Sequence, residues 1–235
     1  MIIAANFKTN MTRRETAEYY NTVSGYIAEN GISSKAMIFP PATALDVFEG
    51  HVSVGAQNAY AVENGAFTGE IGLDQLDEFA IKTILIGHSE RRHILGESQN
   101  LVAAKFDFYK AKGFTIVYCI GEPLEVREEG NAALMDYLND QFEGIDLEYE
   151  KLIIAYEPVW AIGTGLTPTA DEVELIHTAL RQKTSRPLLY GGSVKTGNAK
   201  ELLALNNVDG ALIGSAALKV DDFCTILSIA DEIRK

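Results

Sequence analysis

Residues 152–165 read Leu-Ile-Ile-Ala-Tyr-Glu-Pro-Val-Trp-Ala-Ile-Gly-Thr-Gly, and they combine a strand-like run, a carboxylate and a loop of small residues. Residues 152–156 predict a buried strand, Glu157 lies where it ends, and Pro158 stops it because proline cannot donate to a strand ladder. A lone acid beside a loop able to close over it is typical of a base that works when water is excluded. The same residues also fit an ordinary strand-to-helix turn with a surface glutamate.

Eight short apolar runs of this kind are spread along the 235 residues, at 2–5, 36–39, 52–55, 83–86, 115–118, 152–155, 188–190 and 210–213. Most are continuously apolar, as expected of parallel strands that are covered on both faces. Apolar residues between the runs recur at helical spacing, for example Phe223, Ile226, Leu227 and Ala230. Thr12 and Thr169 are each followed three residues later by glutamate, a capping box that predicts a helix start.

This alternation of strand and helix predicts a closed (β/α)₈ barrel, with eight parallel strands surrounded by helices. No linker-like region interrupts the pattern, so we expect residues 1–235 to form one domain. A doubly wound open sheet is the alternative, but no G-x-G-x-x-G motif follows the first strand.

Composition limits the partners and the compartment. The formal net charge is -13, which disfavours nucleic acid and anionic membranes. The first residues have no basic segment and no long apolar core, and no run approaches the ~18 apolar residues that span a bilayer. Cys119 and Cys224 lack metal-ligand or redox spacing. We therefore expect a soluble, cytoplasmic protein with reduced thiols.

Polar residues follow several of the predicted strands, at the barrel end where active sites of this fold lie. Asn6 and Lys8 follow the first strand and share one face because side chains alternate along a strand. His88 follows the fourth strand and Glu157 the sixth. Each alone has an ordinary structural explanation, but together they predict a site in which a cation, an imidazole and a carboxylate converge.

The ends of the seventh and eighth strands are rich in glycine and serine, at Gly191-Gly192-Ser193 and Gly214-Ser215. In this fold these ends usually bind phosphate, because exposed backbone N–H groups there bind an anion without needing arginine. A glycine pair is weak evidence by itself, since it also fits a tight turn.

With these motifs the chain resembles the triosephosphate isomerase family over essentially its whole length. The resemblance rests on A-A-N-F-K, Q-N-A-Y, G-A-F-T-G-E-I, G-H-S-E-R-R, Y-C-I-G-E, A-Y-E-P-V-W-A-I-G-T-G, L-Y-G-G-S-V and V-D-G-A-L-I-G-S-A, in family order and spacing. It implies reversible interconversion of dihydroxyacetone phosphate and D-glyceraldehyde 3-phosphate through an enediolate, a step of glycolysis and gluconeogenesis. It implies no metal or organic cofactor.

The resemblance also implies a role for each matching residue. Glu157 matches the general base, His88 the electrophile, and Lys8 the cation that stabilises the enediolate, with Asn6 beside it as an orienting donor. Glu90 matches an acid that contacts Lys8. The residues that match the phosphate contacts are Gly163, Ser193, Gly214 and Ser215.

The segment from Asn58 to Leu73 is long for a connection and carries Phe67 near its tip. It fits a surface excursion, but the resemblance implies a loop that docks into a second subunit of a homodimer. The chain departs from the common family pattern at Met11, where glycine is frequent, and at Pro168, close to the far end of the loop that follows Glu157.

Three other functions remain open from the sequence. A Schiff-base aldolase would use Lys8 as its nucleophile. An isomerase of a larger phosphorylated sugar would use the same fold, although the short strand-end loops leave it little room. A non-catalytic scaffold would not need Asn6, Lys8, His88 and Glu157 together.

Overall fold

The computed structural model describes residues 1–161 and 166–234, in which eight parallel strands form one sheet. The strands are β1 (Ile2–Asn6), β2 (Lys35–Phe39), β3 (Val52–Val54), β4 (Thr83–Ile86), β5 (Thr115–Ile120), β6 (Leu152–Tyr156), β7 (Leu188–Tyr190) and β8 (Gly210–Ile213). Their order is β3-β2-β1-β8-β7-β6-β5-β4. A parallel bridge between Ala56 and Ile84 joins the two outer strands, so the sheet closes on itself. The predicted (β/α)₈ barrel is confirmed.

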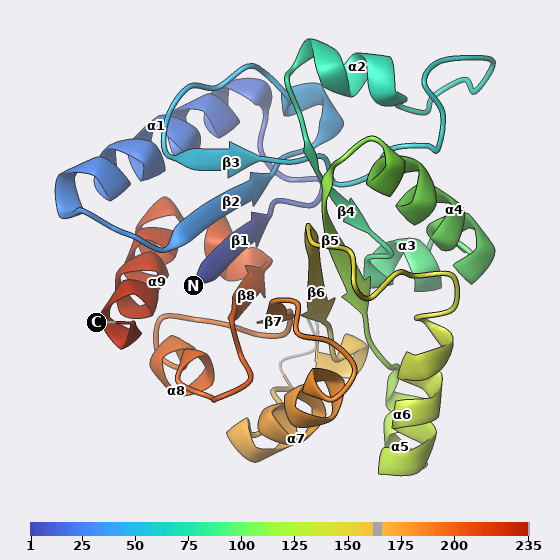
Figure 1. Ribbon diagram of the computed structural model, residues 1–235. Helices are drawn as coiled ribbons and strands as arrows, with labels where there is room; N and C mark the ends of the chain where they lie inside the picture. The colour runs from blue at the N-terminus through green and yellow to red at the C-terminus, as the bar shows by residue number, and fades with distance from the viewer. Residues whose placement is uncertain (162–165, 235) are drawn as a thin grey trace.

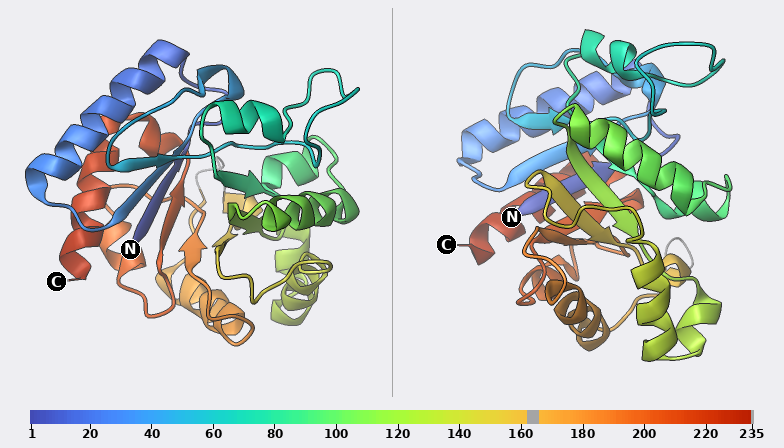
Figure 2. Two further views of the ribbon diagram at one scale, coloured as in Figure 1. Left: turned by 45° about the horizontal axis from the view of Figure 1, so that its top comes forward. Right: turned by 45° about the vertical axis from the view of Figure 1, so that its right-hand side comes forward.

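Helices surround the strands on the outside (Figures 1 and 2). The α-helices are α1 (Arg13–Asn30), α2 (Leu73–Glu78), α3 (Ser89–His93), α4 (Gln99–Ala111), α5 (Leu124–Glu128), α6 (Asn131–Asp140), α7 (Ala170–Arg181), α8 (Ala199–Leu203) and α9 (Val220–Ile233). Short 3₁₀ turns are η1 (Ala42–Ala44), η2 (Val159–Ala161) and η3 (Ser215–Leu218). No helix in the described part of the chain is long and apolar enough to cross a bilayer.

Both predicted capping boxes are present. Thr12 caps α1: its N–H donates to Glu15 Oε2 at 2.7 Å, while the Glu15 N–H donates to its hydroxyl at 3.4 Å. Thr169 caps α7 in the same way with Glu172, at 2.8 and 3.3 Å. Each box satisfies N–H groups that have no partner inside the helix, so it fixes where the helix begins.

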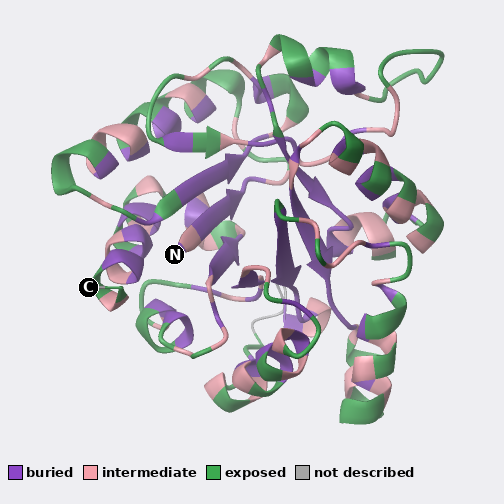
Figure 3. Ribbon diagram, in the orientation of Figure 1, coloured by how far each residue is buried: buried purple, intermediate pink, exposed green. Residues whose placement is uncertain are grey.

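Alternation along each strand divides the apolar residues between two cores. In β6, Ile153 and Ala155 face the barrel interior, while Ile154 and Tyr156 pack against the outer helices. Figure 3 shows the result, with mostly buried strands at the centre and outer helices that carry both buried and exposed residues. Glu157 continues the inward series of β6, so its side chain reaches the barrel mouth. Cys119 and Cys224 are both buried free thiols, as predicted.

The segment from Asn58 to Leu73 projects away from the barrel between β3 and α2, as all three views show (Figures 1 and 2). Backbone hydrogen bonds hold its base, from Tyr60 N–H to the Ile71 carbonyl and from Leu73 N–H to the Val62 carbonyl. Near its tip, the ring of Phe67 packs on Tyr60 at 4.6 Å between centroids. The excursion is therefore an ordered arm rather than a loose connection.

One histidine is part of the outer core. His177 of α7 is 0% exposed, and its ring lies against Tyr156 and Tyr190. Its Nδ1 lies 2.9 Å from the Asn207 carbonyl, so Nδ1 carries the proton and donates. Burial lowers the pKa of His177 to about 4, because a charged imidazolium would lose its hydration there.

This buried histidine predicts a loss of stability in mild acid. The unfolded chain binds a proton at His177 near its ordinary pKa of 6.5, whereas the folded protein does so only near 4, so stability falls as pH drops through this window. Between pH 7 and pH 5 the free energy of unfolding should fall by about 2 kcal/mol through this group alone. Urea unfolding at both pH values should show that His177→Gln loses correspondingly less than wild type. Equal losses would assign the acid sensitivity to other groups.

Candidate active site

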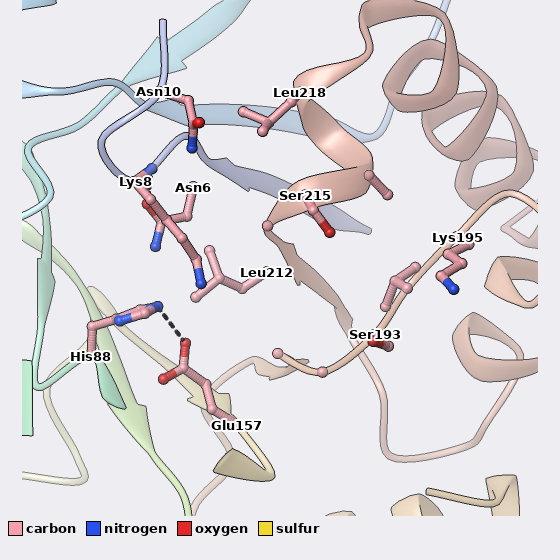
Figure 4. Close-up of a pocket in the computed structure, with 15 residues that line it drawn as sticks. Asn6, Lys8, Asn10, His88, Glu157, Ser193, Lys195, Leu212, Ser215 and Leu218 are labelled. Atoms are coloured by element: carbon pink, nitrogen blue, oxygen red, sulfur yellow. Dashed lines mark hydrogen bonds and ion pairs between the residues drawn. The ribbon is translucent and has the colours of Figure 1, made fainter. Parts of the chain in front are cut away.

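A cavity of about 160 Å³ opens at the carboxyl ends of the strands (Figure 4). It brings together seven of the nine residues that the sequence singles out, namely Asn6, Lys8, His88, Glu157, Ser193, Gly214 and Ser215. Glu90 is not part of its lining but contacts Lys8. Gly163 lies outside the described residues. Strands that are far apart in the sequence therefore supply one small site.

Glu157 is almost completely buried, with 2% of its surface exposed. One carboxylate oxygen, Oε2, accepts the N–H of Ser89 at 3.0 Å, and the other, Oε1, lies 3.1 Å from His88 Nε2. Gly191 leaves room for this side chain, since a Cβ at that position would lie 2.7 Å from Glu157 Cγ. The glycine at the end of β7 thus has a packing reason besides any contact with a ligand.

Strand alternation alone would point His88 away from the mouth, because it has the same parity as the outward-facing Ile86. The reversal comes from Gly87, which adopts φ 76°, a left-handed conformation that favours glycine. A side chain there would also meet the Arg92 guanidinium at 2.6 Å. His88 can therefore cap α3 with Nδ1, which accepts the Glu90 N–H at 3.3 Å, and turn Nε2 toward Glu157.

Lys8 reaches the cavity through an unusual backbone conformation, with φ 53°. Its own N–H donates to Asn6 Oδ1 at 3.0 Å, and its ammonium donates to Glu90 Oε1 at 2.5 Å. Met11 also has positive φ, at 69°, which explains why a glycine suits that position better. The turn that carries Lys8 is thus held in a strained form by its side-chain contacts.

The opposing effects of burial and charge set the pKa values of the central pair. Burial lowers the pKa of His88, but the charge and hydrogen bond of Glu157 raise it by more, and the net direction is upward. Burial raises the pKa of Glu157, but His88 and the Ser89 N–H lower it by more, so Glu157 is ionised at neutral pH. Because the Glu90 N–H points at Nδ1, the neutral tautomer of His88 carries its proton on Nε2 and donates to Glu157.

The far side of the cavity consists of the glycine- and serine-rich ends of β7 and β8, including Ser193, Gly214 and Ser215. The structure adds two lining residues that the sequence does not single out: Lys195 on this side, and Asn10 on the opposite side, in the turn that carries Lys8 (Figure 4). Lys195 follows the turn after Ser193, and the strand pattern gives no signal for a lysine in that loop. The Lys195 ammonium and the glycine- and serine-rich backbone on this side suit an anionic group of a small ligand.

No group of three or more His, Cys, Asp or Glu side chains within 1–161 and 166–234 is placed to hold a metal ion. The cavity itself presents a carboxylate, an imidazole and an ammonium, from Glu157, His88 and Lys8. A parallel barrel with this set at its mouth defines an enzyme of the (β/α)₈ class that moves protons on a small anionic substrate.

Comparison with known proteins identifies the family. The triosephosphate isomerase family model matches residues 1–230. A triosephosphate isomerase of Sulfurimonas denitrificans is 57% identical over 235 residues, which cover 100% of this chain and 98% of that protein. The corresponding values are 59%, 97% and 99% for one from a Sulfurovum species, and 45%, 97% and 98% for one from Campylobacter hominis. The chain belongs to the triosephosphate isomerase family and is an isomerase.

The pairing of His88 with Glu157 predicts how the imidazole titrates. Glu157→Gln removes the largest contribution that raises the pKa of His88 and leaves burial and the Lys8 charge, which lower it, opposed only by the smaller contribution of Glu90. The pKa of His88 should therefore fall in Glu157→Gln, as measured by NMR titration of the ring nitrogens. His177, whose pKa is set by burial and by Asn207, Asp209 and Arg181 rather than by Glu157, serves as the internal control. An unchanged or raised His88 pKa would contradict the pairing.

Proposed function

We propose that the cavity interconverts dihydroxyacetone phosphate and D-glyceraldehyde 3-phosphate, the step of glycolysis and gluconeogenesis that the family performs, with Glu157 as the base. The observation that carries this proposal is the contact between Glu157 and His88 in a cavity that Lys8 also lines. Transfer of a proton between adjacent carbons needs a carboxylate at the carbons and donors at the two oxygens, and these residues supply both.

Glu157 must leave its present partners to act. In the structure its carboxylate is occupied by the Ser89 N–H and by His88. When substrate fills the cavity, the carboxylate turns from Ser89 toward the carbon-bound proton. Its lowered pKa means that it arrives ionised and able to accept that proton. Loss of the Ser89 hydrogen bond increases its basicity at the moment when it is needed.

His88 becomes the electrophile after the same movement. Once the Glu157 carboxylate has turned away, the main contribution that raises the pKa of His88 is gone, so the neutral ring is favoured. A neutral Nε2–H donates well to two oxygens of similar basicity, because the proton can pass between them without a large energy difference. A neutral histidine electrophile is general in triosephosphate isomerases, and the contact of Nδ1 with the Glu90 N–H favours that form in this chain.

Lys8 and Asn6 stabilise the negative charge that develops on the enediolate. The Lys8 ammonium is held by Glu90 at 2.5 Å, and Asn6 fixes the backbone of Lys8, so neither group has to be ordered when substrate binds. The phosphate lies on the far side, against backbone N–H groups of Ser193, Gly214 and Ser215. The family resemblance assigns a further phosphate contact to Gly163, which lies outside the described residues. The small volume of the cavity supports a triose rather than a larger sugar.

The position of the base gives a sharp test. Glu157→Asp withdraws the carboxylate by one methylene, and kcat for isomerisation of glyceraldehyde 3-phosphate should fall by about two orders of magnitude, because reacting groups must be placed to within about 1 Å. A coupled assay measures the rate. Glu150→Asp, at an exposed position, is the matched control and should keep wild-type activity. If Glu157→Asp were as active as wild type, Glu157 would not be the base.

We also infer that two copies of the chain form a dimer through the arm from Asn58 to Leu73. Three large apolar side chains support this: Phe67 on the arm is 43% exposed, and Ile94 and Leu95 after α3 are 76% and 64% exposed. Side chains of this size cost free energy in water, and a second subunit that covers them would recover it.

The dimer is tested at the arm itself. Phe67→Ser should shift the protein toward the monomer at micromolar concentration, as seen by analytical ultracentrifugation, because an anchor of the interface is lost. Leu175→Ser on α7 is the control, since Leu175 is 50% exposed but distant from the arm in sequence. An equal shift in both variants, or a shift in neither, would show that the arm is not part of the interface.

The remaining expectations stay proposals. One sheet of eight strands and one large connected outer core support a single domain of residues 1–235. The two buried free thiols and the acidic composition support the cytoplasm as the compartment.

A further inference from the structure

The two ends of the segment 161–168 are attached to one short stretch of chain, residues 122–127, which includes most of α5. At the first end, Trp160 Nε1 donates to Glu122 Oε1 at 2.9 Å. Tyr156 at the end of β6 donates to the same oxygen at 3.0 Å. Glu122 thereby holds residues on both sides of Glu157, the proposed base, from a fully buried position.

Arg127, five residues after Glu122, contacts both ends. Its guanidinium lies over the ring of Trp160, 5.8 Å from the centroid. Its Nη2 also donates to Glu172 Oε1 at 2.7 Å. Glu172 is the residue whose other oxygen closes the capping box with Thr169, so this ion pair holds the first turn of α7. One side chain thus connects the residue before the segment with the residues after it.

We propose that Arg127 is a positioning residue for isomerisation, which holds Trp160 and the Thr169–Glu172 cap at a fixed separation. It acts through these residues and does not touch the substrate. Trp160 lies three positions after Glu157, and Thr169 follows the part of the chain that contains Gly163. The inference therefore rests on the proposed function, in which Glu157 is the base and Gly163 contacts phosphate.

The chemistry of arginine suits this role. A planar guanidinium stacks on an aromatic face and bonds a carboxylate at its edge at the same time, whereas an ammonium has no plane to stack. Arg127 is mostly buried, with 16% of its side chain exposed, so both contacts are partly shielded from water. Because the two ends are already in place, substrate binding does not have to order them. Glu157 then keeps its position relative to the residues that bind the phosphate.

The experiment compares Arg127→Gln and Arg127→Lys with two controls. Glu172→Gln removes the ion pair but retains a capping box, since glutamine also serves at that position. Arg13→Gln breaks an exposed ion pair with Asp46 at the start of α1 and should change nothing. Trp160 is the only tryptophan in the sequence, so intrinsic fluorescence reports directly on the stacking contact.

We expect Arg127→Gln to lower kcat/KM about ten-fold or more, with KM raised and kcat reduced together. Both constants change because the substitution displaces the base as well as the residues that bind the phosphate. The emission of Trp160 should shift in the folded, substrate-free protein. Arg127→Lys should recover part of the activity through the retained charge, and Glu172→Gln should lose less than Arg127→Gln because Trp160 keeps its cation.

Wild-type kcat and KM in folded Arg127→Gln would overturn the proposal, as would an unchanged Trp160 emission spectrum. A fall in the thermal midpoint with unaltered kinetics would make Arg127 a purely structural residue and would overturn it as well. Failure of the proposed function looks different: wild type would then lack isomerase activity while the fluorescence shift at Arg127→Gln persisted.

Discussion

The hydrogen bonds of Ala56 turn an eight-stranded sheet into a barrel. Its N–H donates to the Thr83 carbonyl and its carbonyl accepts the Leu85 N–H, both at 2.9 Å, so that β3 and β4 are joined although they form no regular ladder. Without this closure the two outer strands would expose unpaired backbone groups. With it, the carboxyl ends of all strands form one ring. Lys8, His88 and Glu157, which follow β1, β4 and β6, meet only because of that ring.

The ring of strand ends also brings together the groups that keep the buried Glu157 carboxylate ionised. Burial alone would favour the neutral acid at Glu157, and the Ser89 N–H and His88 offset that effect. These stabilising partners belong to the resting arrangement and are not the substrate atoms. In the proposed mechanism substrate has to replace these partners, so the pKa values of Glu157 and His88 both change when the carboxylate moves. In that mechanism, one movement of the carboxylate affects both residues.

The sequence predicts most of this arrangement for physical reasons that can be named. The strands are continuously apolar because both of their faces are covered. The helix caps at Thr12 and Thr169 are predictable because each threonine is followed three residues later by the glutamate that completes the capping box. The orientation of His88 is not predictable from alternation, because it depends on the positive φ of Gly87. The roles of Lys195 and Arg127 cannot be predicted from the sequence for another reason. Their neighbours in space are distant along the chain, and a lone cation in a loop or helix is ordinarily a solvated charge.

Pro168, which departs from the common family pattern, and Arg127 both restrict the start of α7. Pro168 is buried directly before the cap of α7, its φ is fixed by its ring, and it restricts the preceding Thr167. Arg127 holds the same cap from the other side through Glu172. The α7 end of the segment therefore has little conformational freedom left to lose. On the other end, Trp160 is held by a hydrogen bond and a stacked cation, both of which can be exchanged without breaking the backbone. Both ends of the segment are therefore anchored to residues 122–127, and Trp160 and the cap of α7 already have a defined separation before substrate binds.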